Sequence, residues 1–396
     1  MKSLSNINMA AVTRLTREGR LDEAMHLLRG GRLLDPGCAA RPASTSMVGD
    51  EAPVIDMEPP SAANGGAWTA PSVPASTRQP SPSPSTRSAT LDRLLKPRIR
   101  IGAVVERASA ALPPGARFEE RTHGSALAQL SYKLYVPGSH DGTPLGLLVM
   151  LHGCTQSPDD FARGTRMNTL AEEHGFVVAY PAQAQSANAS RCWNWFSASH
   201  QHRDGGEPSL VAGITREVMR ELAIDPRRVH VAGLSAGGAM ASILGAAYPE
   251  LYAAVGVHSG LAPHAAHDMP SAFAAMRRGA AHSAASGRNV PTIVFHGDAD
   301  PTVSAINGDQ VMEQARGTAQ LYRRTEAGCS ADGVAYTRSV ESFADGRPCL
   351  EQWLLHGGGH AWSGGDPGGS FVAPHGPDAS REMLRFFAET GAAPNA

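Results

Sequence analysis

The sequence predicts an α/β fold in which a mostly parallel sheet is covered by helices on both faces. Two observations predict it. After residue 91, short apolar segments alternate with longer amphipathic segments, as strands and helices do in such sheets. The composition, 42% hydrophobic and 18% charged in 396 residues, is that of a globular protein with enough apolar material for one large core. Active sites in these sheets lie beyond the carboxyl ends of the strands.

The residues before this region have a different composition. Residues 1–34 contain apolar residues at mostly helical spacing, interrupted by Gly19, which predicts a short helical hairpin or a solvated tail with transient helix. Residues 35–90 are rich in proline, serine and alanine, so they cannot bury enough apolar surface to offset the entropy of ordering. We therefore expect a disordered linker there and a single folded domain in residues 91–396.

The elements of this domain are predicted from hydrophobic pattern and turn signals. The predicted strands cover residues 127–137, 145–153, 175–181, 228–234, 253–259, 291–297 and 350–357. The predicted helices cover residues 157–174, 208–223, 236–247 and 378–389. The first helix opens with Ser157 and Pro158, an N-cap followed by a first-turn proline. Residues 260–289 are too many for a turn and predict a small helical cap that lines the pocket of a site at this edge of the sheet.

Ser235 lies in the sequence GLSAGG, directly after one predicted strand and before a predicted helix. The Gly-x-Ser-x-Gly pattern alone is weak. Its strand-turn-helix setting, however, is typical of a strained elbow that holds a serine hydroxyl at a helix N-terminus. The alternative is a serine that only caps its helix. We interpret Ser235 as a candidate nucleophile.

A serine nucleophile needs an imidazole to take its proton and a carboxylate to orient that imidazole. The strand at 291–297 ends in DADPTV, which offers Asp298 and Asp300 in one loop. Asp300 lies further past the strand, and Pro301 stiffens the exit, so we favour Asp300 and expect Asp298 to cap the turn. A solvated turn acid is the alternative for either residue.

The last predicted strand continues into LLHGGGHAWSGG. Among the sixteen histidines, only His356 and His360 follow a strand downstream of the acid within a glycine-rich loop. His356 still lies at the strand end, whereas three glycines extend the chain before His360. We therefore favour His360 as the general base. The alternative is an ordinary surface-loop histidine.

Acyl transfer also requires backbone N–H groups that stabilise the oxyanion. Ala236 supplies one N–H group because it follows Ser235. The turn LHGCTQ, after the strand at 145–153, predicts a second from Cys154. A nucleophilic Cys154 thiol is a much weaker alternative, because the serine elbow is better placed. No metal or cofactor is expected for this chemistry.

Four stretches, LHGCTQSPDDFARGTRMNTLAEEHGFVVAYPAQ, RCWNWF, VAGLSAGGAMA and GGGHAWSGG, resemble the polyhydroxybutyrate depolymerase family of esterases. That family is a branch of the α/β-hydrolases that also grades into feruloyl and acetylxylan esterases. The resemblance runs from about Arg117 to Phe387. It implies an α/β-hydrolase fold and a triad of Ser235, Asp300 and His360 that hydrolyses hydroxyalkanoate esters through an acyl-enzyme.

The resemblance also bears on the aromatic residues near the predicted site. Four of them are expected to form an apolar wall for an aliphatic polyester or an aromatic acyl group, with a small satellite core as the alternative. They are Trp193, Trp195 and Phe196 in SRCWNWF and Trp362 on the facing loop.

Family members often pair the cysteine of the HGC turn with the cysteine before the tryptophan. This implies a disulfide between Cys154 and Cys192. Cys329 and Cys349 flank a predicted hairpin and are candidates for a second pair. Both pairs are at odds with a reducing cytoplasm.

Net charge and hydropathy limit the classes of partner and the cellular locations that we expect for this protein. A net charge of -2 gives no reason to expect nucleic acid or an anionic membrane as partner. The N-terminal segment lacks the apolar run and cleavage site of a signal peptide, and no apolar run reaches the roughly 18 residues of a membrane span. We expect a cytoplasmic enzyme acting on storage granules or soluble oligomers, with the granule surface as a candidate partner of the N-terminal helices. The rival interpretations are a feruloyl or acetylxylan-type carbohydrate esterase and a non-catalytic granule-binding homologue.

Overall fold

The computed structural model describes residues 112–125, 128–138, 142–280 and 290–390. The helical segment expected in residues 1–34 and the linker expected in residues 35–90 lie outside them. The predicted domain boundary at residue 91 stays a prediction for the same reason.

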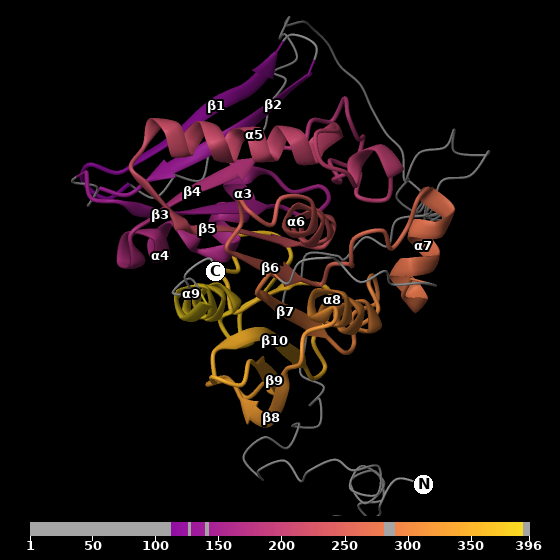
Figure 1. Ribbon diagram of the computed structural model, residues 1–396. Coiled ribbons are helices and arrows are strands. Elements are labelled where there is room, and N and C mark those ends of the chain that lie inside the picture. Colours follow the sequence, from indigo (N-terminus) through magenta and orange to yellow (C-terminus); the bar gives the residue numbers. More distant parts are fainter. Residues whose placement is uncertain (1–111, 126–127, 139–141, 281–289, 391–396) are drawn as a thin grey trace, which may run out of the picture. The chain divides into compact units, whose positions relative to one another are not determined.

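A ten-stranded sheet organises the described residues (Figure 1). Its order is β1-β2-β4-β3-β5-β6-β7-β10-β9-β8. The strands from β4 to β10 in this order run parallel, and two antiparallel strands extend the sheet at each edge. The strand bounds are Arg117–Ser125 (β1), Ala128–Val136 (β2), Leu145–Leu151 (β3), Phe176–Pro181 (β4), Ile224–Leu234 (β5), Ala254–His258 (β6), Thr292–Gly297 (β7), Tyr322–Cys329 (β8), Ala335–Ser342 (β9) and Pro348–Leu355 (β10).

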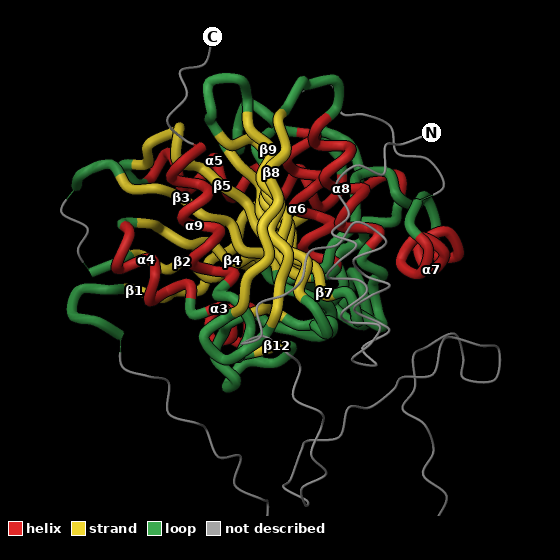
Figure 2. Tube along the Cα trace, turned by 90° about the horizontal axis from the view of Figure 1, so that it is seen from below, coloured by secondary structure: helices red, strands yellow, loops and turns green. Residues whose placement is uncertain are grey.

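Helices cover both faces of this sheet, which confirms the predicted architecture (Figure 2). Apolar residues of α5, α6, α7 and α8 share one core with the sheet, and those of α3, α4 and α9 share the other. The bounds are Pro158–Thr165 (α3), Met167–His174 (α4), Gly206–Glu221 (α5), Ala236–Ala247 (α6), Met269–Arg278 (α7), Ile306–Arg316 (α8) and Ala379–Thr390 (α9), with a short 3-10 helix at Ala198–His200 (η3).

The central strands have few exposed residues because both faces are covered. Every residue of β3, β4, β6 and β7 is buried, which explains their continuous apolar sequence. The pattern missed β1, β8 and β9, which lie toward the edges of the sheet and are largely exposed or half-buried. Such strands carry charged residues in place of an apolar run, so hydrophobicity alone does not reveal them.

The helix predicted at residues 157–174 is two helices, and this corrects the sequence prediction. Arg166 separates α3 from α4 with a left-handed backbone, φ 55°. Its guanidinium group donates hydrogen bonds to Gly364 O at 2.8 Å and to Asp378 Oδ2 at 2.7 Å. The break therefore ties this helix pair to the segment that follows His360.

The insertion between β6 and β7, predicted as a helical cap, contains α7. Its Met276 carbonyl accepts hydrogen bonds from Ser304 N at 2.7 Å and from Asn307 Nδ2 at 3.2 Å. These contacts fix the end of α7 to the chain just beyond Asp300. That the insertion lines an acyl pocket stays a prediction.

Candidate active site

Ser235 occupies the sharp turn between β5 and α6. Its backbone has φ 57° and ψ -120°, a conformation that non-glycine residues rarely adopt. The strain is held by hydrogen bonds on both sides: Ser235 N donates to His258 O at 2.8 Å, and Ser235 O accepts from Ala239 N at 2.9 Å. The hydroxyl is thus presented at the N-terminus of α6.

The two glycines that flank Ser235 are required by close backbone contacts. A Cβ atom on Gly233 would lie 2.4 Å from the carbonyl carbon of Gly237. A Cβ atom on Gly237 would lie 2.0 Å from the carbonyl oxygen of Leu151. The Gly-x-Ser-x-Gly pattern is therefore a packing requirement of this elbow, because a side chain at either position would displace backbone.

His360 connects the serine to a carboxylate. Its Nε2 atom lies 2.8 Å from Ser235 Oγ, and its Nδ1 atom lies 2.7 Å from Asp300 Oδ2. With Nδ1–H donating to the carboxylate, Nε2 is left to accept the hydroxyl proton of Ser235. The structure thus brings together three residues that are 65 and 60 positions apart along the chain.

The Asp300 side chain is more buried than that of His360: it has no exposed surface, whereas the His360 side chain is 12% exposed. Its Oδ1 atom accepts hydrogen bonds from Thr302 N and Val303 N, both at 2.8 Å. Burial on its own raises the pKa of Asp300, but the hydrogen bond and charge of His360, with these two N–H groups, outweigh it. The pKa of Asp300 therefore lies below its ordinary value, and the carboxylate is ionised at neutral pH.

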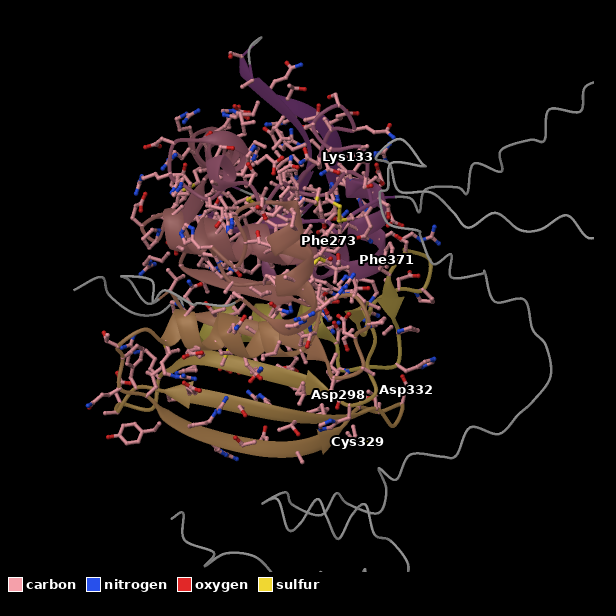
Figure 3. All side chains as sticks on the ribbon, turned by 90° about the vertical axis from the view of Figure 1, so that its right-hand side faces the viewer. Lys133, Phe273, Asp298, Cys329, Asp332 and Phe371 are labelled. Carbon is pink, nitrogen blue, oxygen red and sulfur yellow. A yellow bond between two sulfur atoms is a disulfide. The ribbon has the colours of Figure 1, made fainter. Side chains whose placement is uncertain are left out.

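Asp298 and His356, the two residues not favoured by the sequence, form a pair of their own. His356 Nδ1 lies 2.8 Å from Asp298 Oδ2, and His356 Nε2 lies 2.9 Å from Thr337 Oγ1. Asp298, labelled in Figure 3, also accepts a hydrogen bond from Gly357 N at 2.7 Å. This second pair bridges the same two loops as Asp300 and His360 but does not contact Ser235.

The turn after β3 lies against the serine. A Cβ atom on Gly153 would be 3.6 Å from Ser235 Cβ. The Gly153 and Thr155 N–H groups are used internally, by Gln156 Oε1 at 2.9 Å and Ser190 O at 2.7 Å. The Cys154 N–H group makes no hydrogen bond to a described residue. With the Ala236 N–H group, in the first turn of α6, it is available to a negatively charged oxygen beside Ser235.

Buried polar contacts hold this turn from behind. His152 O accepts a hydrogen bond from Trp193 Nε1 at 3.0 Å, and His152 Nε2 accepts one from Gln183 N at 3.1 Å. Burial lowers the pKa of His152 to about 4, so its imidazole is neutral and stays an acceptor at neutral pH. A disulfide joins Cys154 to Cys192 with their Cα atoms 4.2 Å apart, so the turn is also linked covalently to the segment before Trp193.

The expected aromatic wall is largely part of the core, which corrects the sequence prediction. Trp193 and Trp362 are 0% and 1% exposed, and Trp195 is also buried. The indole nitrogen of Trp362 donates to Ser380 Oγ at 3.1 Å, so this ring points into the core beneath α9. Only Phe196 of the four is half-buried, and it packs edge-on against Trp195. The indole N–H groups of Trp193 and Trp362 both have hydrogen-bond acceptors in the core, as buried tryptophans usually do.

The second proposed disulfide is wrong. Cys349 is a free, buried thiol, whereas Cys329 takes part in a disulfide. Burial raises the pKa of the Cys349 thiol to about 11, so it is protonated and inert at neutral pH.

Phe371 is an exposed aromatic residue that the sequence analysis missed. The residue is 46% exposed, and its backbone has a positive φ of 52°. Figure 3 labels its position. Its neighbour Ser370 accepts a hydrogen bond at its carbonyl from Gln156 Nε2 at 3.0 Å and donates its backbone N–H to Asp160 Oδ1 at 2.9 Å. Because Gln156 also holds Gly153, Phe371 is anchored beside the turn at Ser235. The glycines and serine before it, GGSF, were the available signal.

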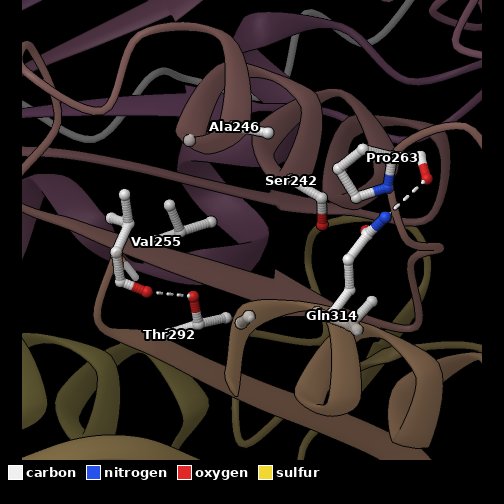
Figure 4. Close-up of a pocket in the computed structure, with 10 residues that line it drawn as sticks. Ser242, Ala246, Val255, Pro263, Thr292 and Gln314 are labelled. Carbon is white, nitrogen blue, oxygen red and sulfur yellow. Dashed lines mark hydrogen bonds between the residues drawn. The ribbon is translucent and has the colours of Figure 1, made fainter. Parts of the chain in front are cut away.

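A small pocket lies elsewhere, between α6, β6, β7 and α8 (Figure 4). Thr292, at its edge, begins β7, whereas the residues around Ser235 lie beyond the ends of the strands. Gln314 crosses it and donates a hydrogen bond to Pro263 O at 3.2 Å. None of the predicted site residues lines this pocket.

No helix among the described residues has both the length and the apolar content needed to cross a lipid bilayer.

Comparison with known sequences is consistent with this geometry. The profile of the family described as Esterase PHB depolymerase matches residues 130–332. Poly(3-hydroxyalkanoate) depolymerase C of Paucimonas lemoignei is 31% identical over 227 residues, which are 54% of this chain and 54% of that protein. Poly(3-hydroxybutyrate) depolymerase of Ralstonia pickettii is 27% identical over 66% of this chain and 58% of that protein. A probable acetylxylan esterase A of Aspergillus clavatus is 32% identical over 39% of this chain and 50% of that protein. The chain thus spans about half the length of the curated relatives it matches.

Comparison with solved structures agrees on the fold. The acetyl xylan esterase from Aspergillus awamori aligns over 68% of this chain and 99% of its own length, with a TM-score of 0.54 and 21% identity. At this identity the likeness shows the fold alone, which is the α/β-hydrolase fold implied by the sequence.

Proposed function

Because the chain belongs to the Esterase PHB depolymerase family, we propose that it hydrolyses carboxylic esters with Ser235 as nucleophile. The observation that supports this most strongly is the double hydrogen bond of one imidazole. His360 lies 2.8 Å from the Ser235 hydroxyl and 2.7 Å from the Asp300 carboxylate. The geometry suits proton removal from the hydroxyl by the imidazole.

The proposed reaction proceeds through an acyl-enzyme. Ser235 Oγ attacks the ester carbonyl carbon while His360 Nε2 takes the hydroxyl proton, and Asp300 stabilises the resulting imidazolium. The N–H groups of Cys154 and Ala236 hold the negatively charged oxygen of the tetrahedral intermediate. His360 then gives its proton to the leaving alcohol, and a water molecule activated by the same imidazole releases the acid.

The proposed substrates are esters of hydroxyalkanoates, as polymer or oligomers. Two of the relatives are named for depolymerising poly(3-hydroxyalkanoate) and poly(3-hydroxybutyrate). Phe371, whose carbonyl accepts a hydrogen bond from Trp362 N at 2.7 Å in the loop of His360, offers exposed apolar surface that would suit an aliphatic polyester better than a polysaccharide. A cytoplasmic location and binding to a storage granule through the N-terminal helices stay predictions.

The main alternative substrate class is an acylated carbohydrate. Relatives named acetylxylan esterase are 32% and 34% identical to this chain over the aligned residues, close to the 31% of the depolymerase from Paucimonas lemoignei. Turnover of 3-hydroxybutyrate oligomers, acetylated xylan and methyl ferulate by one preparation separates these classes. Preference for the oligomers supports our proposal, and preference for acetylated xylan or methyl ferulate contradicts it.

The nucleophile is tested with Ser235→Ala and a fluorophosphonate probe. The variant should lose at least about three orders of magnitude in ester turnover, and the probe should label the wild type at Ser235. A variant that keeps a tenth of the activity would refute the assignment. Failure of the wild type to react with the probe would favour a non-catalytic hydrolase homologue that only binds polymer.

A further inference from the structure

His258 is the last residue of β6 and lies between the strands that lead to Ser235 and to Asp300. Its side chain is completely buried. The imidazole stacks on Phe295 of β7, with ring centroids 5.7 Å apart, and on Trp362 of the histidine loop, at 5.2 Å. One side chain therefore packs between two of the segments that build the site.

Two hydrogen bonds join His258 to the elbow of Ser235 and to the loop that carries His360. Its main-chain carbonyl accepts the Ser235 N–H at 2.8 Å, which fixes the elbow. Its Nε2 atom accepts the Ser363 N–H at 3.0 Å, three residues after His360. The same residue thus holds the strained serine with its backbone and the histidine loop with its side chain.

The role of Nε2 as acceptor determines the tautomer of this histidine. Because Nε2 accepts, the ring proton lies on Nδ1, which is 3.2 Å from Ser259 Oγ. Burial, aided by the nearby His296 and His360, lowers the pKa of His258 to about 3. The ring therefore stays neutral and keeps its acceptor over the whole neutral range.

We propose that His258 is a positioning residue that sets the distance between Ser235 and His360. The proposal rests on the function proposed above, in which these two residues exchange a proton. Proton transfer requires them at hydrogen-bond distance, and a displacement of about 1 Å can reduce the rate about 100-fold. The Ser363 contact is the only described hydrogen bond from the His258 imidazole to the histidine loop, so its loss should move His360 relative to the elbow.

His230 provides a matched control for a histidine that only packs. It is also completely buried, burial also lowers its pKa to about 3, and it stacks on Phe387 with ring centroids 4.5 Å apart. It lies near the start of the buried part of β5, and its ring neighbours, Phe176 and Phe387, are not part of the site. Its replacement therefore perturbs the core without touching the contacts of Ser235.

The test compares His258→Phe, His258→Gln and His230→Phe with p-nitrophenyl butyrate as substrate. Phenylalanine at 258 keeps the aromatic stack but leaves the Ser363 N–H group without an acceptor. We expect kcat to fall about 10- to 100-fold with KM within about twofold. Glutamine at 258 places an oxygen near the position of Nε2 and should restore kcat to within about fivefold of wild type. His230→Phe should keep wild-type kcat at a comparable loss of thermal stability.

Separate variants test the positioning role of His258 and the nucleophilic role of Ser235. Equal kcat in the two Phe variants, or no rescue by His258→Gln, would overturn the positioning role. Ser235→Ala is assayed in parallel: activity in that variant would refute the nucleophile itself. If His258→Phe does not fold, His258→Met, which also lacks the acceptor, takes its place in the same comparison with His258→Gln.

Discussion

Two Asp–His pairs bridge the same two loops of this protein. They consist of the same two residue types but differ in burial and in the residue that each pair contacts. The inner pair, Asp300 and His360, has side chains 0% and 12% exposed and contacts a serine on a strained elbow. The outer pair, Asp298 and His356, has side chains 38% and 33% exposed and contacts a threonine on β9, the strand beside the edge strand β8. Their Nδ1–carboxylate distances, 2.7 Å and 2.8 Å, are nearly the same.

Hydrogen-bond distance alone therefore does not identify a reactive pair. An exposed pair is screened by water, whereas a buried pair acts in a medium of lower dielectric, where its charges interact more strongly. The inner pair also contacts the Ser235 hydroxyl through His360, whereas the outer pair contacts Thr337 of β9. The outer pair instead reinforces the backbone bonds between the loops, such as Ala299 N to Gly358 O at 3.1 Å.

The largest difference between the pairs should come from their carboxylates. Asp300→Asn replaces an acceptor by an amide donor opposite His360 Nδ1, so the imidazole is driven to the tautomer that cannot accept the Ser235 proton. We expect kcat to fall about 10³- to 10⁴-fold, as a wrong tautomer costs in serine hydrolases generally. Steady-state turnover of p-nitrophenyl butyrate measures the loss.

The matched control is Asp298→Asn, which makes the same change in the outer pair. It should retain kcat within about threefold of wild type. Similar losses in the two variants would show that the inner and outer pairs are not functionally distinct.

The positions of both pairs follow from the order of the strands along the chain, so they could be predicted from the sequence. The carboxyl ends of β7 and β10 must meet at one edge, since these strands are parallel neighbours, so DADPTV and LLHGGGHAW had to face each other. Asp300 and His360 lie further past their strand ends than Asp298 and His356 do, which favoured them from the sequence. In the structure they are also the more buried of the two pairs. The side-chain environment was not accessible to this reasoning: Trp193 and Trp362 belong to the cores, and nothing in the spacing distinguishes a core indole from an exposed one.

The missed features have related causes. Phe371 is exposed because Ser370, Gln156 and Asp160 hold its loop, and such a contact joins residues over 200 positions apart. The role of His258 depends on a hydrogen bond to Ser363, again far along the chain. Hydrophobic periodicity is a local signal, so it locates elements well and long-range polar contacts poorly.

Burial behind the inner pair should also appear in the pH dependence of stability. The folded pKa of His258 is about 3, well below the ordinary value of about 6.5 expected in the unfolded chain. Between these values the unfolded chain binds a proton that the folded protein does not, so stability falls as the pH falls from about 6.5. The contribution is about 1.4 kcal/mol per pH unit.

His258→Phe lacks this titration, so its deficit in the free energy of unfolding relative to wild type should narrow by about 1 to 3 kcal/mol between pH 6.5 and pH 4.5. Urea unfolding at several pH values measures the deficit, with pH 7.5 as the reference at which the group is neutral in both states. A deficit that does not change with pH would contradict a neutral buried imidazole behind the inner pair.

A smaller effect on substrate binding is expected from the exposed ring of Phe371. Phe371→Asn removes an exposed ring, and asparagine tolerates the positive φ at this position. Loss of about 1 kcal/mol of apolar contact should raise KM for 3-hydroxybutyrate oligomers about three- to tenfold, with little change in kcat for p-nitrophenyl acetate. Tyr322→Asn is the control, because Tyr322 is 69% exposed at the opposite end of the sheet. Equal effects of the two substitutions would refute a substrate role for Phe371.

The smallest effect should come from His356→Ala in the outer pair. Polar side-chain contacts with this exposure contribute about 0 to 1 kcal/mol, and the loops keep the Asp298 bond to Gly357 N and their backbone bonds to each other. We therefore expect the thermal midpoint to fall by only a few degrees and kcat to stay within about threefold of wild type. Calorimetry and ester turnover, run beside Thr337→Val, measure both quantities. A tenfold loss of kcat without loss of folded protein would mean that the outer pair sets the geometry of the inner one, because no substrate-facing group is removed by this change.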